Sequence, residues 1–278
     1  MIDWTEGRGF LNAGGRRLEW GVFGPEPDGT APVIVLLHEG LGCLALWRDF
    51  PQRLSEASGL PVFAYSRAGY GQSEACDLPR PLDYMTCEAV DVLPDVLDAL
   101  GAAQVILMGH SDGATIAAIY AGRVQDIRVR GVVMMAPHFF AEEMGLGEIA
   151  RAKVAFETTD LKTKMARYHA NPDAAFRGWN GAWLDPGFRT WNVADVIDCL
   201  NVPVLVIQGR GDQYGTLAQV EEVKRRSQRM VKAVILDDCQ HAPQFDQPER
   251  VLEEVAVFSE MCIKLPRGGV VGDEAYEL

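Results

Sequence analysis

The chain has 278 residues and a mass of 30.5 kDa, and 48% of its residues are hydrophobic while 23% are charged. This length and apolar content suit one large α/β domain or two ordinary domains, and they exclude an intrinsically disordered chain. A net charge of −13 and a pI near 4.8 repel phosphate backbones, and no basic run interrupts the acidic sequence, so we expect no nucleic-acid partner.

The sequence shows no signal for secretion or for a membrane. Residues 1–6 are acidic and lack an apolar segment, and the longest uncharged apolar run, 131–141, is shorter than the roughly 20 residues of a membrane helix. The six cysteines are scattered without a C-x-x-C pair, which is typical of reduced thiols. No Cys or His pair has the spacing of a metal site. We therefore expect a cytoplasmic protein without a metal or a membrane partner.

The predicted elements begin with an antiparallel hairpin, in which 9–12 and 17–23 flank a pair of glycines. Short runs rich in β-branched residues then predict strands buried on both faces at 33–37, 61–65, 104–108, 129–135, 202–208 and 232–236. Amphipathic segments predict helices at 47–57, 86–100, 114–122, 217–228 and 248–261. This alternation predicts a mostly parallel sheet covered by helices on both faces.

One segment, residues 138–195, interrupts the alternation because it contains no buried-strand run. We call it the cap, since an insertion of this length is more often a functional lid than a structureless loop. The predicted organisation is a core at 1–137, the cap at 138–195, the rest of the core at 196–265 and a flexible tail at 266–278. Nine aromatic residues lie in the cap: Phe139, Phe140, Phe156, Tyr168, Phe176, Trp179, Trp183, Phe188 and Trp191.

Most of these aromatic side chains are expected to form the small core of the cap itself. A few of them, such as Phe140 and Trp183, are candidates for the lining of an apolar acyl or aryl pocket. Two arginines of the cap, Arg177 and Arg189, could instead recruit an anionic substrate.

The sequence Gly109-His110-Ser111-Asp112-Gly113 fits the pattern G-x-S-x-G and lies between a predicted strand and a predicted helix. A serine in this position sits on a strained turn that requires small neighbours and lifts the hydroxyl above the sheet. The following helix directs its N-terminus at the reacting centre. This context makes Ser111 the candidate nucleophile.

A serine hydroxyl needs a base and an orienting carboxylate before it can attack. Of the five histidines, His241 follows the last predicted strand, at the edge of a parallel sheet where active sites lie. Asp212 follows the preceding strand and is the natural carboxylate. Its rivals, Asp237 and Asp238, are too close in sequence to His241 to approach the imidazole from behind easily. The predicted catalytic triad is therefore Ser111, Asp212 and His241.

These features resemble the α/β-hydrolase superfamily over nearly the whole chain, up to about residue 265. Two further segments are similar to family motifs: the loop 37–42 with the sequence LHEGLG, and the turn 66–73 with the sequence SRAGYGQS. The resemblance implies an eight-stranded, mostly parallel sheet with a helical cap, and chemistry without a cofactor. It also implies an oxyanion hole from the backbone N–H groups of Asp112 and Gly40, with Glu39 as the competing assignment for the second donor.

Two carboxylates depart from the common family pattern, Glu39 in the first loop and Asp112 beside the nucleophile. Both would oppose a developing oxyanion if they pointed inward, so we expect them to turn away and be neutralised, Glu39 by a pair with Arg67. The alternative is that Glu39 or Asp112 binds a cationic or hydroxylated group of the substrate. His38 is expected to anchor the loop through a backbone hydrogen bond.

The resemblance implies a hydrolase for a small, largely apolar carboxylic ester or thioester, acting through an acyl-enzyme. One alternative is a carbon–carbon bond hydrolase for a diketone-type product of aromatic ring cleavage, and a perhydrolase side activity is compatible with the same residues. Another is a ligand-binding receptor on the same fold. Epoxide hydrolases and haloalkane dehalogenases of the superfamily need a carboxylate at the elbow, where this chain has Ser111. The expected partner is a small-molecule substrate, with a homo-oligomer possible.

Overall fold

A computed structural model describes residues 2–265, and the predicted tail at 266–278 lies outside the described residues. The eight strands form one sheet in the order β1-β2-β4-β3-β5-β6-β7-β8. Only the pairs β1–β2 and β2–β4 are antiparallel, which confirms the predicted hairpin and the mostly parallel sheet. The strands are β1 (Arg8–Ala13), β2 (Arg16–Phe23), β3 (Val33–Leu37), β4 (Val62–Tyr65), β5 (Val105–His110), β6 (Val129–Met135), β7 (Val204–Gly209) and β8 (Val231–Leu236).

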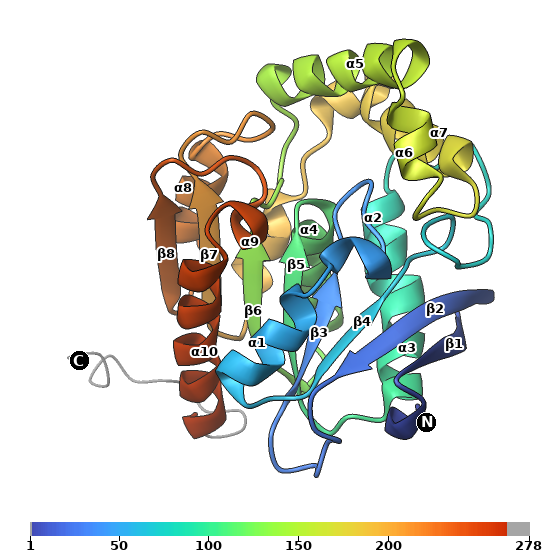
Figure 1. Cartoon of the computed structure of the whole chain (residues 1–278). Coiled ribbons are helices and arrows are strands. Elements are labelled where there is room, and N and C mark those ends of the chain that lie inside the picture. Colours follow the sequence, from blue (N-terminus) through green and yellow to red (C-terminus); the bar gives the residue numbers. More distant parts are fainter. Residues whose placement is uncertain (1, 266–278) are drawn as a thin grey trace.

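Helices cover both faces of this sheet (Figure 1). One face packs against α1 (Phe50–Ser58) and α10 (Pro248–Lys264), and the other against α3 (Leu93–Leu100), α4 (Asp112–Ile119) and α8 (Ala218–Arg226). Two short helices, α2 (Tyr84–Cys87) and α9 (Pro243–Asp246), precede α3 and α10.

The buried strands supply side chains to both faces. Along β3, Val33, Val35 and Leu37 enter the core under α3 and α4, whereas Ile34 and Leu36 enter the core under α1 and α10. Successive side chains of a strand point to opposite faces, so a strand with two buried faces needs an unbroken apolar run. This is the physical reason why short apolar runs in the sequence predicted the strands.

Two predicted helix boundaries were wrong. The helix predicted from Trp47 begins at Phe50, because Arg48 has a φ of 57° that a right-handed helix cannot include. The helix predicted at 86–100 begins at Tyr84 and contains one π-helical turn, Glu88–Val92, before α3.

The cap residues form three α-helices above the carboxyl ends of the parallel strands (Figure 1). These helices are α5 (Glu143–Thr158), α6 (Leu161–Met165) and α7 (Pro172–Trp183). The chain enters after β6 and returns before β7, and the two passages are joined where the N–H of Val193 donates to the carbonyl of Phe139 over 2.7 Å. Within the cap, Phe156 stacks on Phe176 with ring centroids 4.0 Å apart, so several aromatic side chains form its own core as expected.

Candidate active site

The nucleophile elbow lies between β5 and α4. Ser111 has a φ of 54° and a ψ of −119°, a strained conformation for a residue with a side chain. A Cβ at Gly109 would lie 2.2 Å from the backbone of Gly113, and one at Gly113 would lie 2.0 Å from the carbonyl oxygen of Leu37. Both glycines of the pattern are therefore required by backbone contact, and α4 begins directly after the serine.

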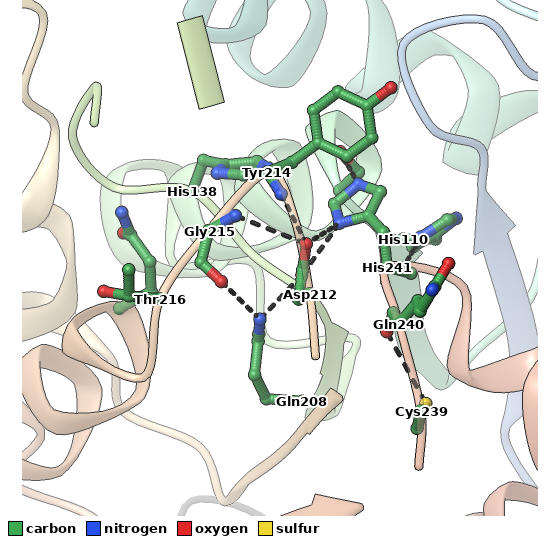
Figure 2. Close-up of polar contacts among 12 residues, drawn as sticks. His110, His138, Gln208, Asp212, Tyr214, Gly215, Thr216, Cys239, Gln240 and His241 are labelled. Atoms are coloured by element: carbon green, nitrogen blue, oxygen red, sulfur yellow. Dashed lines mark hydrogen bonds and ion pairs between the residues drawn. The ribbon is translucent and has the colours of Figure 1, made fainter. Parts of the chain in front are cut away.

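The structure brings the three predicted catalytic side chains together, and Figure 2 shows the contact between Asp212 and His241. His241 Nε2 lies 3.0 Å from Ser111 Oγ, and His241 Nδ1 lies 2.9 and 2.8 Å from the two carboxylate oxygens of Asp212. The rival Asp237 is bonded instead to Arg210, over 2.6 Å. Asp212 is thus the carboxylate that reaches the imidazole.

Hydrogen bonds hold Asp212 as a carboxylate. Burial alone would raise its pKa, but the bonds from His241 and from the N–H of Tyr214 outweigh burial and lower the pKa below the ordinary value. Gln208 Nε2 donates to Oδ2 of the same group over 2.7 Å. An ionised carboxylate accepts only, so Nδ1 of His241 carries the proton and the lone pair of Nε2 faces Ser111.

The loop after β3 is anchored by buried polar contacts. His38 Nε2 accepts from the N–H of Arg67 over 3.0 Å, which leaves Nδ1 to donate to the carbonyl of Glu39 over 2.7 Å. Burial and the nearby Arg67 hold the pKa of His38 well below its ordinary value, so the ring is neutral. These are the backbone contacts that we expected of His38.

The expected pair between the carboxylate of Glu39 and Arg67 was wrong. The guanidinium of Arg67 donates to the backbone carbonyls of His38 and Glu39 instead, because it is buried beneath the loop. The carboxylate of Glu39 lies 3.6 Å from Nδ1 of His110. Burial would raise the pKa of Glu39, but the contact with His110 outweighs it and the pKa is lowered.

The carboxylate of Asp112 faces α2 and is fully buried. The hydroxyl of Tyr84 donates to its Oδ2, and the indole N–H of Trp183 donates to that hydroxyl over 2.9 Å. Burial raises the pKa of Asp112, with Arg67 and Tyr84 acting against the shift. A hydrogen-bond chain therefore links the elbow to the cap helix α7.

A cavity of about 100 Å³ opens at Ser111, under the cap. Helices α5 and α7 supply one wall, so the cap covers the elbow. The cavity is lined by Glu39, Gly40, Leu41, Ser111, Asp112, His138, Ile149, Trp179, Trp183, Tyr214 and His241.

Two of the nine cap aromatics, Trp179 and Trp183, line this cavity, and the candidate Phe140 does not. Phe140 lies where the cap joins the sheet, in a β-bridge with Asn192, and its carbonyl accepts from Gln219 Nε2 over 3.0 Å. This backbone pairing holds Phe140 at the junction of the cap and the sheet. The arginines Arg177 and Arg189 are exposed and lie beside acidic side chains of the cap.

Sequence reasoning missed several lining residues, chiefly His138 and Trp179. Trp179 and Trp183 are four residues apart on α7 and therefore share one face, a periodicity that could have selected both. His138 packs edge-on against Trp183 with ring centroids 5.3 Å apart, and 5.6 Å from His241. Burial and the neighbouring His241 lower the pKa of His138 to about 3, so the ring is neutral.

The depressed pKa of His138 predicts a stability loss in acid. A group whose pKa is about 3 when folded and near 6.5 when unfolded contributes stability above pH 6.5 that is lost as the pH falls. Between pH 7.5 and 5.0 wild type should lose about 2 kcal/mol more than His138→Gln. Urea denaturation of both proteins at the two pH values measures this difference. Because His38 and His169 are present in both proteins, parallel stability losses would contradict the assignment.

Within residues 2–265, no group of three or more His, Cys, Asp or Glu side chains is placed to hold a metal ion. Nor does that part of the chain contain a helix long and apolar enough to cross a bilayer.

A parallel sheet with a serine on a strained strand-to-helix turn, an imidazole at its hydroxyl and a carboxylate behind the imidazole defines the α/β-hydrolase class. The sequence model of the alpha/beta hydrolase family matches residues 34–254, and the chain belongs to this family.

Named relatives share parts of this sequence. Epoxide hydrolase 3 of Xenopus tropicalis is 25% identical over 266 residues, which cover 81% of this chain and 70% of the relative. Epoxide hydrolase B of Mycobacterium tuberculosis is 34% identical over 130 residues, 47% of this chain and 35% of the relative. The crystal structure of VinJ superposes with a TM-score of 0.71 at 26% identity, covering 92% of this chain and 98% of VinJ.

Proposed function

We propose that this protein is a serine hydrolase that cleaves a carboxylic ester or thioester with a small, largely apolar acyl group. The observation that carries the proposal is the contact of His241 with both Ser111 and Asp212 at the floor of the cavity. Nε2 of His241 takes the proton of Ser111 as the oxygen attacks the carbonyl carbon. The imidazolium then gives this proton to the leaving group, and water, activated by the same ring, releases the acid from the acyl-enzyme.

The backbone N–H groups of Asp112 and Gly40 are the proposed oxyanion donors. Asp112 is the first residue of α4, where N–H groups lack partners within the helix. Gly40 lines the cavity, and a Cβ there would lie 2.2 Å from Nε1 of Trp179, so the loop approaches α7 too closely for a side chain. Each such donor stabilises the tetrahedral intermediate by roughly 3 kcal/mol.

The names of the curated relatives raise epoxide opening as a competing activity. Ring opening by a carboxylate gives an ester, which water can hydrolyse, whereas ring opening by a serine would leave an ether that water does not cleave. Ser111 therefore supports acyl transfer over epoxide opening in this chain.

The size of the cavity supports a short acyl group. Its volume of about 100 Å³ is smaller than an engineered apolar cavity of roughly 150 Å³ that holds benzene. The side chains of Leu41, Ile149, Trp179 and Trp183 make the walls mainly apolar. Short alkyl groups gain burial there.

A panel of phenyl esters tests the proposal. From acetyl to butyryl, kcat/KM should rise about tenfold, because each buried CH₂ contributes about 0.8 kcal/mol. From butyryl to octanoyl it should fall, because the longer chain exceeds the cavity. Hemisuccinate esters serve as the anionic control and should react more slowly than butyrate.

Other outcomes of the same panel would favour the alternatives. Cleavage of a vinylogous 1,5-diketone without cleavage of any ester would indicate a carbon–carbon bond hydrolase. Tight binding of the panel without any turnover would indicate a receptor. A flat response across the acyl series together with a preference for the hemisuccinate would contradict the apolar pocket.

A further inference from the structure

The nucleophile and the base come from strands that are not neighbours. Ser111 follows β5, whereas His241 lies in the loop 237–242 that follows β8. The strands β6 and β7 lie between them in the sheet. The distance of 3.0 Å between Ser111 Oγ and His241 Nε2 therefore depends on what holds this loop against β5.

Most hydrogen bonds of the loop 237–242 do not reach β5. The N–H of Gly211, after β7, donates to the carbonyl of Cys239 over 2.9 Å. The N–H of Gln240 donates to the carboxylate of Asp246, in α9, over 2.7 Å. These hydrogen bonds hold the loop to the segment after β7 and to α9. They do not set the distance between the loop and β5.

One buried side chain crosses this gap. Nε2 of His110, the residue before the nucleophile, lies 2.6 Å from the carbonyl oxygen of His241, and the two rings lie 5.0 Å apart (Figure 2). In residues 2–265 no other hydrogen bond joins the loop 237–242 to β5 or the elbow, except that of Ser111 with His241. His110 is 3% exposed, so water does not compete for this bond.

The surroundings of His110 fix which of its two nitrogens faces His241. A carbonyl oxygen only accepts, so Nε2 of His110 must carry a proton. The side-chain amide of Gln244, in α9, lies 3.0 Å from Nδ1. The carboxylate of Glu39 lies 3.6 Å from the same nitrogen, within ion-pair distance.

We propose that His110 is a positioning residue, which ties the backbone of the base His241 to the strand that carries Ser111. This inference rests on the proposed function, because it concerns the geometry of the proposed triad. Through its hydrogen bond to the backbone carbonyl of His241, His110 sets how closely the loop approaches the elbow. Loss of the bond lets the imidazole move away from the hydroxyl, and misplacement by about 1 Å can cost roughly 100-fold in rate.

The test compares His110→Phe with His110→Gln. Phenylalanine keeps a ring in the buried space but has no donor, whereas glutamine keeps an N–H at a similar reach. The readouts are kcat and KM for the best ester of the panel, and the rate at which an aryl phosphonate labels Ser111. We expect His110→Phe to lose 10- to 100-fold in kcat and in the labelling rate with little change in KM. His110→Gln should recover to within about fivefold of wild type.

His169→Phe is the matched control. His169 is likewise a buried histidine that contacts a backbone carbonyl, that of Leu41, over 3.1 Å, and it does not contact the triad. His169→Phe should lose about as much melting temperature as His110→Phe, because both remove a buried histidine. Its labelling rate should stay within about threefold of wild type.

The outcomes separate the two proposals. If wild type does not react with the phosphonate at Ser111, the proposed function fails. If wild type reacts and a folded His110→Phe labels at the same rate, only the role of His110 fails. Equal losses in His110→Phe and His110→Gln, or a change confined to KM, would also overturn that role. If His110→Phe does not fold, the result for His110→Gln alone decides, since a donor at this position should suffice.

Discussion

Replacement of Ser111 by alanine should lower kcat by roughly 10⁴- to 10⁶-fold while the melting temperature stays nearly unchanged. Among residues 2–265, the hydroxyl of Ser111 is the only group hydrogen-bonded to Nε2 of His241. Without it no acyl-enzyme can form, and the proposed oxyanion donors can assist only an unassisted attack by water. Steady-state hydrolysis of the phenyl butyrate ester and differential scanning calorimetry measure the two quantities.

Two further observations complete this experiment. The intact mass of wild type, quenched during the pre-steady-state burst, should increase by one acyl group, and that of Ser111→Ala should not. Ser259→Ala removes a buried hydroxyl in α10, away from the cavity, and should leave the rate within about twofold of wild type. More than a few per cent of residual activity in Ser111→Ala would reject the nucleophile.

Replacement of Asp212 by asparagine should lower kcat by about 10⁴-fold, with a smaller effect on KM. The amide can donate to Nδ1 of His241, which would stabilise the tautomer with its proton on Nε2. That proton would then face Ser111 Oγ, where a lone pair is needed. The pH profile of kcat/KM and the steady-state constants of this variant provide the measurement.

The neighbouring carboxylates supply the comparison for this variant. Asp237→Asn removes the partner of Arg210 at an exposed position, and Asp238→Asn changes a turn residue with a φ of 53°. Both variants should retain kcat within about threefold of wild type. A loss in Asp237→Asn or Asp238→Asn as large as that in Asp212→Asn would contradict the assignment of the carboxylate.

The named relatives of this chain include epoxide hydrolases, and this chain has a serine at the elbow. In this chain the sheet order and the loops after β7 and β8 place a carboxylate and an imidazole at the elbow. Under the proposed function, the identity of residue 111 decides which covalent intermediate water can release.

The candidate site was predictable where its geometry depends on neighbouring residues. The small side chains of Gly109 and Gly113 are needed within one turn of backbone, so the pattern around Ser111 specifies that turn wherever a strand precedes it. The order of the strand ends indicated Asp212 and His241, because carboxyl ends of parallel strands share one edge. Neither inference required knowledge of which strands are adjacent.

The contacts of Glu39, Phe140 and His110 could be identified only from the tertiary structure. Arg67 reaches under the loop to two carbonyls, the cap passages pair at Phe140, and His110 reaches a loop that follows a strand three places away in the sheet. Each contact joins segments separated by many residues, and side chains of this length can reach several acceptors. The strands, the elbow and the chain order of the candidate catalytic residues could be predicted from the sequence, because they follow from periodicity and local sterics. Only the packing of distant segments decided which polar groups meet and which rings line the cavity.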